Sequence, residues 1–562
     1  MKKSRNKSRA IISWISQITG SDRKRVILIL VIEIIQALCS LSFAMALRSF
    51  INAVVSGNTA EFRTGVVILL VLLLVMIGLS SGLRFLKEYT GTSICKKFRM
   101  QELQQILNKS YAQVIGIHSG EWMNRIDSDA SVVASGVTNI APNVFSMCVR
   151  LIGALYLLVR LIPEVAWVII PGGCILGLLT FLFRGKLKRM HKEQQEAQGN
   201  FRIFVQERLE NLLVIHSFSK EKNVQTEGDE KQETYRQKHI ARDNFSNICN
   251  VGFGIVMDGA YVLGICYCGY RMLQGTMEYG TLIAVMNLVS QVQSPFANLS
   301  GYVPQYYAML ASAERLMEVE SFADAFAEPP YAEDKVIEFY DRKLKSICLR
   351  NVSFSYGEKD KDRKVLQNFS VSISKGSVTA VTGPSGCGKS TLLKILMCLY
   401  PLDGGECVLT TDKEEIPLNG KWRGLYAYVP QGNQLMAGSI REVVTFGNQN
   451  LYTDDRGIWK ALKVADAESF VKELPLQLDT RLGEHGNGLS EGQLQRLAIA
   501  RAVYEKHPVL LLDESTSSLD ERTEQTVLKN IRNLTNYTVV LVTHRKAPLE
   551  ICDQQIDMEN IV

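Results

Sequence analysis

The chain divides by its hydrophobic pattern at roughly residue 310. Before that point, long apolar runs alternate with long polar stretches, and after it short apolar runs alternate with charged turns. A helix needs ~20 mostly apolar residues to cross the hydrocarbon core of a bilayer. Six runs have about this length: Val26–Ser49, Thr64–Leu86, Val137–Val159, Glu164–Phe183, Ile248–Tyr270 and Thr281–Pro304. They predict six membrane-spanning helices.

Two of the connections between these runs are polar stretches of roughly fifty to sixty residues with helical periodicity and few breakers, which predicts helices that continue beyond the bilayer. Basic residues border both stretches: Lys87, Lys96, Lys97 and Arg99, and Arg184, Lys186, Lys188 and Arg189. By the positive-inside rule both stretches lie in the cytoplasm. The chain is therefore expected to be a multi-pass plasma-membrane protein with a cytoplasmic N-terminus and a cytoplasmic C-terminal half. Residues 1–25 hold a short amphipathic stretch, which predicts an interfacial elbow helix.

The C-terminal half has the pattern of an α/β domain. Apolar alternation predicts strands at Ile347–Phe354, Val365–Ile373 and Val378–Thr382, with a helix from Lys389. A charged segment with two prolines, 319–343, is expected to be a linker. The predicted fold is thus multidomain: an all-α six-helix transmembrane domain at 26–318, followed by an α/β domain at 344–562.

Composition narrows the partners. Net charge is +6, and the excess lies at the N-terminus and beside the apolar runs, so nucleic acid is an unexpected partner. The twelve cysteines lack metal-ligand spacing and are expected to be small apolar fillers.

A phosphate-binding loop follows the third predicted strand of this half. The sequence GPSGCGKST fits G-x-x-x-x-G-K-[ST], in which backbone N–H groups surround phosphates, the lysine reaches them and the hydroxyl contacts Mg²⁺. The domain at 344–562 is therefore expected to be a P-loop nucleotide-binding domain, and its expected cofactors are ATP and Mg²⁺. The residues assigned to ATP are Gly383, Pro384, Ser385, Gly386, Cys387, Gly388, Lys389, Ser390 and Thr391, and Ser390 is also assigned to Mg²⁺.

A second motif, LSEGQ at Leu489–Gln493, resembles the signature of ATP-binding cassette (ABC) proteins. Four further segments resemble motifs of ABC exporters: Ser119–Asp129, Glu207–Glu221, Ala311–Glu318 and the LGEHG loop at Leu482–Gly486. The resemblance implies a half-size exporter that works as a dimer, in which the turns near Ser119–Asp129 and Glu207–Glu221 dock on the cassettes. It also implies that Ser490, Gly492 and Gln493 of one protomer face the ATP of the other. Glu491 stands where the family more often has glycine.

The remaining site residues are predicted from their position at the end of a strand or from this resemblance. Asp513 ends an apolar strand and is expected to hold Mg²⁺, and Glu514 is the candidate general base. Resemblance implies that Tyr356 stacks on adenine and that His544 contacts the γ-phosphate. It implies that Gln431 senses Mg²⁺ and the attacking water, and that Asp520 lies at the dimer seam. Helix capping or solvation is the alternative for Gln431 and Asp520.

Polar residues within the apolar runs have two possible roles. Asn287, Gln291, Ser294 and Asn298 share one side of the sixth run, where they would line a substrate path or make interhelical hydrogen bonds. Glu33, Arg150 and Asp258 are ionisable groups at membrane depth. Asp258 is hypothesised to join a polar cavity or to pair with a cation such as Arg150.

The predicted function is ATP-driven export, or flipping, of a substrate by alternating access. A homodimer is the simpler assembly, and a heterodimer with a related half-transporter stays open. The substrate class is open between a hydrophobic drug, a peptide and a lipid or glycoconjugate. A more remote alternative is an ATP-gated channel or a regulatory ATPase.

Overall fold

The computed structural model describes residues 2–325, 329–356, 364–432, 434–483, 488–534, 536–545 and 547–559, and of 2–6, 165–182, 184, 257, 260, 294–300 and 449 only the backbone. The chain forms two compact units. The helical unit comprises Met1–Glu102 and Met123–Met317, and the α/β unit comprises Leu103–Trp122 and Glu318–Val562. Each unit is described by itself below.

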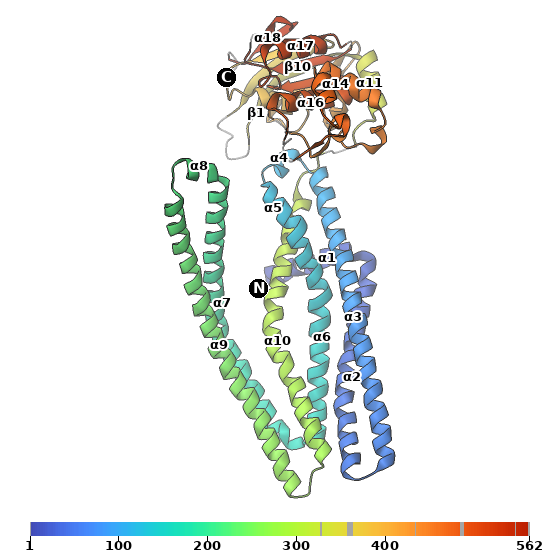
Figure 1. The fold of residues 1–562 in the computed structure, drawn as a ribbon, viewed down its shortest axis with the longest axis vertical. Coiled ribbons are helices and arrows are strands. Elements are labelled where there is room, and N and C mark those ends of the chain that lie inside the picture. The colour runs from blue at the N-terminus through green and yellow to red at the C-terminus, as the bar shows by residue number, and fades with distance from the viewer. Residues whose placement is uncertain are drawn as a thin grey trace. The chain divides into compact units, whose positions relative to one another are not determined.

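Seven helices supply most of the helical unit (Figure 1): α1 (Lys2–Thr19), α2 (Arg23–Val55), α3 (Thr59–Asn108), α6 (Ala130–Leu161), α7 (Ala166–Glu210), α9 (Glu221–Leu273) and α10 (Tyr279–Glu318). Nearly all of each predicted membrane run lies in one of the last six. With 50 residues, α3 is ~75 Å long at 1.5 Å per residue, far more than a bilayer core. Helices α7 and α9 run side by side as a hairpin, with the short α8 (Leu212–Ser217) at its tip.

Among the described residues, four helical stretches are long and apolar enough to cross a membrane: Lys7–Val55, Thr59–Asn108, Ser119–Leu161 and Glu221–Leu273. The other two predicted runs fall on α7 and α10, where many of the side chains lie outside the described ones. On α3, Val67, Leu70 and Leu74 are each more than half exposed, as lipid-facing residues of a membrane helix would be. The predicted combination of a helical membrane domain with an α/β domain is confirmed.

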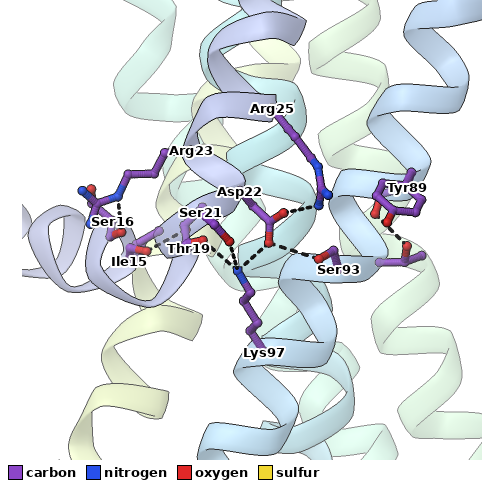
Figure 2. A network of polar contacts seen from close by, with 11 residues as sticks. Ile15, Ser16, Thr19, Ser21, Asp22, Arg23, Arg25, Tyr89, Ser93 and Lys97 are labelled. Carbon is purple, nitrogen blue, oxygen red and sulfur yellow. Dashed lines mark hydrogen bonds and ion pairs between the residues drawn. The ribbon is translucent and has the colours of Figure 1, made fainter.

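The elbow helix α1 is fixed to its neighbours by apolar and polar contacts. Ile11, Trp14 and Ile15 are buried, and the Trp14 ring lies 5.6 Å from that of Phe98 on α3. Where α1 turns into α2, the carboxylate of the buried Asp22 contacts Arg25, Lys97 and Ser93 (Figure 2). This network joins the elbow to the C-terminal half of α3.

The α/β unit contains two main sheets. The antiparallel sheet has the order β2-β1-β4-β5, with strands β1 (Leu344–Phe354), β2 (Leu366–Ser374), β4 (Gly404–Thr411) and β5 (Glu415–Pro417). The parallel sheet has the order β11-β3-β10-β9-β6, with strands β3 (Val378–Thr382), β6 (Tyr426–Val429), β9 (Val509–Asp513), β10 (Thr538–Val542) and β11 (Gln554–Asp557). Alternate residues of β9 enter two different apolar clusters, so this sheet is buried on both faces.

The remaining elements surround these sheets. The helices are α4 (Tyr111–Val114), α5 (Ser119–Asn124), α11 (Glu333–Arg342), α12 (Lys389–Leu396), α13 (Ile440–Val444), α14 (Asp455–Val464), α15 (Glu468–Glu473), α16 (Glu491–Tyr504), α17 (Glu521–Arg532) and α18 (Ala547–Glu550). Strands β7 (Gly438–Ser439) and β8 (Arg481–Leu482) pair with each other. The segment expected to be a linker is not irregular throughout, because α11 buries Val336, Phe339 and Tyr340 in the core beside β1.

Candidate functional site

The predicted site residues follow the carboxyl ends of four neighbouring parallel strands. Val542 of β10 lies opposite Val381 of β3 and Asp513 of β9, and Val429 of β6 lies opposite Leu512. The segments that leave these ends carry the phosphate loop, His544, Glu514 and Gln431. In open parallel sheets this edge is where ligands bind. Residues more than 160 positions apart are thereby brought to one place.

The phosphate loop has a backbone that ordinary residues would strain. Gly386 and Gly388 have φ of +84° and +100°, and a Cβ on Gly383 would lie 2.9 Å from the Cys387 sulfur. Helix α12 begins directly after the loop, so its free N–H groups and dipole favour an anion there. The buried Lys389 ammonium donates to the carbonyls of Gly383 (2.9 Å) and Pro384 (2.8 Å), which holds its charge over the loop. This geometry fits the phosphates of ATP.

Asp513 is the buried carboxylate of the site, with an exposed fraction of 2%. It accepts hydrogen bonds from the Ser390 hydroxyl (2.9 Å) and the Tyr428 hydroxyl (3.0 Å). Burial raises the pKa of Asp513, and the two hydrogen bonds oppose that rise only in part. A desolvated carboxylate beside a hydroxyl is an oxygen donor set that suits Mg²⁺, which usually takes its other ligands from water and phosphate. The described residues hold no cluster of three or more His, Cys, Asp or Glu that would form a metal site without such ligands.

Tyr428 was not among the residues singled out from the sequence. It lies in β6, three positions before Gln431, and nothing in the sequence distinguishes it from a tyrosine that packs in the core. Only the pairing of β6 with β9 brings its hydroxyl to Asp513.

Glu514 is held between two other predicted residues. Gln431 Nε2 donates to Glu514 Oε2 at 2.8 Å, and His544 Nε2 lies 3.3 Å from Glu514 Oε1. The Glu514 backbone has φ of +47°, a left-handed conformation that costs ~1–2 kcal/mol for a residue with a Cβ. Such strain is typical of functional positions, because the surrounding fold must enforce it. The structure therefore assembles Glu514, Gln431 and His544 as one group.

Tyr356 lies beside the phosphate loop. Its hydroxyl and that of Thr391 on α12 are 2.8 Å apart, and its ring packs edge-on against those of Phe354 and Tyr400. The side chain keeps 39% of its surface exposed, which leaves ring area free for a flat ligand.

The signature residues begin a helix. Ser490 caps α16: its hydroxyl accepts from the Gln493 N–H, and the Gln493 side chain accepts from the Ser490 N–H. Glu491 is exposed in the first turn of α16, where the helix dipole stabilises a negative charge. A Cβ on Gly492 would lie 3.2 Å from the Ser518 carbonyl oxygen. Among the described contacts, none joins these residues to the phosphate loop of the same chain.

Asp520 caps a helix, which is the alternative to a dimer-seam role for this residue. It precedes α17 and accepts from the Thr523 N–H at 3.0 Å, and this N–H lowers the pKa of the carboxyl.

Two motifs from distant parts of the sequence meet in the helical unit. Asp129 is buried at the end of the π-helical stretch Arg125–Asp129 and accepts from Arg315 Nε and Ser312 Oγ, both at 2.8 Å. The segments Ser119–Asp129 and Ala311–Glu318 are thus joined by an ion pair between the buried Asp129 and the partly exposed Arg315. The LGEHG loop cannot be placed in the same way, because Glu484–Gly486 lie outside the described residues.

The polar residues of the membrane runs are partly engaged between helices. Gln291 donates to the Ser40 carbonyl of α2 at 3.2 Å, and Asn287 donates to the Ile283 carbonyl of its own helix. These bonds favour the interhelical role over the substrate path for Gln291. Ser294 and Asn298 lie outside the described side chains.

The ionisable residues in the membrane runs do not pair as hypothesised. Asp258 is exposed, and no ion pair between it and Arg150 occurs among the described contacts. Instead, the buried Glu33 pairs with Lys87 of α3, whose ammonium also donates to Asn143 at 3.0 Å. The sequence places Lys87 only at the border of a polar stretch, because it does not show which helix faces Glu33.

Comparison with known families identifies both units. Residues 26–296 match the model described as "ABC transporter transmembrane region", and residues 366–517 match the model described as "ABC transporter". The chain belongs to the ABC transporter family. Its nucleotide-binding part is therefore an ATPase that drives transport, fused to its membrane part.

Similar proteins agree with this membership. "ABC transporter B family member 1" of Dictyostelium discoideum is 29% identical over 91% of this chain, and the match covers 56% of that protein. A putative multidrug export ATP-binding/permease protein of Bacillus subtilis is 26% identical, with 96% of this chain and 93% of that one covered. An ATP-dependent lipid A-core flippase of Photobacterium profundum is 27% identical, with coverages of 78% and 73%.

The transporter also shares its fold with a solved structure. A bacterial Atm1-family ABC exporter with ATP bound superposes with a TM-score of 0.78 at 19% identity, covering 96% of this chain and 94% of that one. The fold is that of an ABC exporter.

Proposed function

We propose that this ABC transporter exports an amphipathic substrate by alternating access, as a dimer of half-transporters that is most simply a homodimer. One observation carries the dimer: the signature residues Ser490 and Gln493 make no described contact with the phosphate loop of their own chain. A second cassette would bring its signature helix to that loop and complete two ATP sites. By the positive-inside argument, the cassette and the N-terminus face the cytoplasm.

In the proposed ATP site the residues share the contacts to the nucleotide and its metal ion. Lys389 and the loop amides would bind the phosphates, while Ser390, Asp513 and Gln431 would hold Mg²⁺ or its water ligands. Mg²⁺ would neutralise charge that develops on the phosphate oxygens. Tyr356 stacks on adenine through its exposed ring face.

The hydrolytic step follows from the group around Glu514. Glu514 accepts a proton from the attacking water while the water oxygen forms a bond to the γ-phosphorus. The bond between that phosphorus and the oxygen of the departing ADP breaks. Gln431 holds the carboxylate in place and His544 donates to the γ-phosphate. Both residues contact Glu514 within the same chain.

The substrate class rests on relatives that have different cargo. Proteins named as multidrug exporters and as lipid A-core flippases both match most of this chain. Drugs and lipids of these kinds share an apolar body with a polar end, which is why we propose an amphiphile. A flippase activity toward lipid is the second candidate.

Transport in proteoliposomes tests the proposal. The full-length chain is reconstituted with its cassettes outward, and Mg²⁺–ATP is added with a fluorescent amphiphilic dye in one series and a headgroup-labelled phospholipid in another. ATP-dependent accumulation of dye supports export, and ATP-dependent loss of outer-leaflet label supports flipping; Glu514→Gln vesicles are the control. ATP-dependent ion current without movement of either probe would overturn the proposal in favour of a channel.

A further inference from the structure

Four tyrosines from distant segments gather in the α/β unit beside the ATP site. Tyr111 is the first residue of α4, in the cytoplasmic turn between α3 and α6, and Tyr400 follows α12. Their rings meet edge-to-face with centroids 5.8 Å apart. Tyr400 meets Tyr356 in the same way at 5.3 Å. The chain of rings therefore runs from the cytoplasmic turn to the residue assigned to adenine.

The same cluster reaches the phosphate and Mg²⁺ side of the site. The Tyr356 hydroxyl bonds to Thr391, which follows Ser390 in α12. The Tyr428 hydroxyl donates to Asp513, and Tyr111 and Tyr356 lie near enough to add to the rise in the pKa of Tyr428 that burial and Asp513 cause. Burial, with Tyr356 and Tyr111, likewise raises the pKa of Tyr400 to about 12. Tyr400 and Tyr428 are thus neutral at physiological pH.

The described hydrogen bonds of the cytoplasmic turn to other segments go to residues outside the sheets. Just before Tyr111, Ser110 N–H donates to the Ala323 carbonyl at 2.8 Å, and Lys109 pairs with Asp324 at 2.8 Å. Those partners belong to the segment that follows α10, not to a sheet. A cavity of about 350 Å³, lined by Ser110, Tyr400 and residues near them, leaves room for the turn to shift.

We propose that Tyr400 is a positioning residue that transmits occupancy of the adenine site to the first cytoplasmic turn through Tyr356 and Tyr111. The inference rests on the proposed function, because it takes Tyr356 as the adenine contact. Edge-to-face pairs depend on ring orientation, so a base stacked on Tyr356 fixes the ring against which Tyr400 packs, and Tyr400 in turn fixes Tyr111. The stimulus is the base, not the phosphates.

Hydrogen exchange in full-length protein in lipid nanodiscs tests this transmission. The parent carries Glu514→Gln so that bound ATP persists, and exchange of the backbone amides at 109–118 is compared without nucleotide, with Mg²⁺–ATP and with Mg²⁺–tripolyphosphate, which lacks a base. ATP should slow exchange and tripolyphosphate should not. Tyr400→Leu should reduce the slowing about fivefold, the equilibrium factor of one edge-to-face pair, and Tyr400→Phe should preserve it.

Three controls keep the result decisive. Tyr452→Leu changes a half-buried tyrosine elsewhere in the α/β unit and should leave the slowing intact. Tyr111→Leu breaks the same path from the other end and should match Tyr400→Leu, which covers the case in which Tyr400→Leu does not fold. Binding of a fluorescent ATP analogue is measured in every variant.

The outcomes separate the two proposals. A parent that binds no ATP analogue would overturn the proposed function. ATP binding with full slowing in Tyr400→Leu or Tyr111→Leu would overturn the transmission through Tyr400 while leaving the proposed function intact. Equal slowing by tripolyphosphate would overturn it as well, because the phosphates alone would then order the turn.

Discussion

Buried charge at the candidate ATP site of the α/β unit is arranged differently from buried charge in the helical unit. In the helical unit, buried carboxylates are matched with cations of other helices, as Glu33 is with Lys87 and Asp129 is with Arg315. At the candidate ATP site, the described hydrogen bonds of the buried Asp513 come from hydroxyl groups, and the Lys389 ammonium donates to two carbonyl oxygens. A charge buried without a counter-charge costs free energy unless a ligand supplies one.

This difference separates architecture from chemistry. The matched pairs are complete and hold helices together, so their loss should affect stability first. The unmatched groups converge on one edge of a sheet, and their missing counter-charges are those that Mg²⁺ and a triphosphate would bring. Four variants test the distinction, in order of decreasing expected effect.

Glu514→Gln should produce the largest change. Removing the proposed general base should lower kcat for ATP hydrolysis by about 10²- to 10⁴-fold, while ATP binding stays within about threefold of wild type. Phosphate release and binding of a fluorescent ATP analogue measure the two quantities. Glu521→Gln, an exposed carboxylate in the same unit, is the matched control and should hydrolyse normally. Hydrolysis at the wild-type rate in Glu514→Gln would remove it from the catalytic role.

Glu33→Gln should act on stability instead. It leaves the Lys87 ammonium without its buried partner, at a cost of about 3 kcal/mol, and Tm of the purified protein should fall by several degrees. Affinity for ATP should not change. The double variant with Lys87→Gln should recover part of the lost Tm, since no unpaired charge remains. A larger loss of Tm in the double variant than in the single one would contradict the pairing.

Tyr428→Phe should weaken the response to Mg²⁺. It removes a hydrogen bond to a carboxylate, and the Mg²⁺ concentration for half-maximal ATPase should rise about tenfold. Tyr426→Phe is a close control, because the buried Tyr426 hydroxyl has no hydrogen-bond partner in the described structure. It should leave both Mg²⁺ dependence and Tm nearly unchanged. Equal effects of the two variants would show that Tyr428 acts only through packing.

Asp513→Asn should change the stability of the protein least, and it should raise Tm rather than lower it. Because burial raises the pKa of Asp513, folding favours the protonated carboxyl, and ionised Asp513 destabilises the ligand-free protein at neutral pH. Asn should therefore raise Tm at pH 7 in the presence of a chelator. The gain should shrink as pH falls below the folded-state pKa and vanish near the unfolded value of about 3.9. A gain that does not depend on pH would exclude the ionisation of Asp513 as its cause.

The local pattern of residues was enough for much of this description. Apolar runs of membrane length predicted the helices, and short alternation predicted β1, β2 and β3 to within a few residues. The phosphate loop, Asp513 and Glu514 could be found because each stands at a fixed place after a strand. These features depend on near neighbours in the chain, where periodicity and motif spacing carry the information.

Other features depend on which distant segments meet. The pairing of β6 with β9 gives Asp513 a second donor in Tyr428, and the packing of α6 against α10 gives Asp129 its cation. The left-handed backbone of Glu514 and the burial of α11 likewise require the finished core. Motif and periodicity thus located the ATP site and the membrane helices. Long-range packing selected the partners of the buried charges, because a polar side chain has many possible partners in the sequence and only one or two of them lie within hydrogen-bond distance in the folded protein.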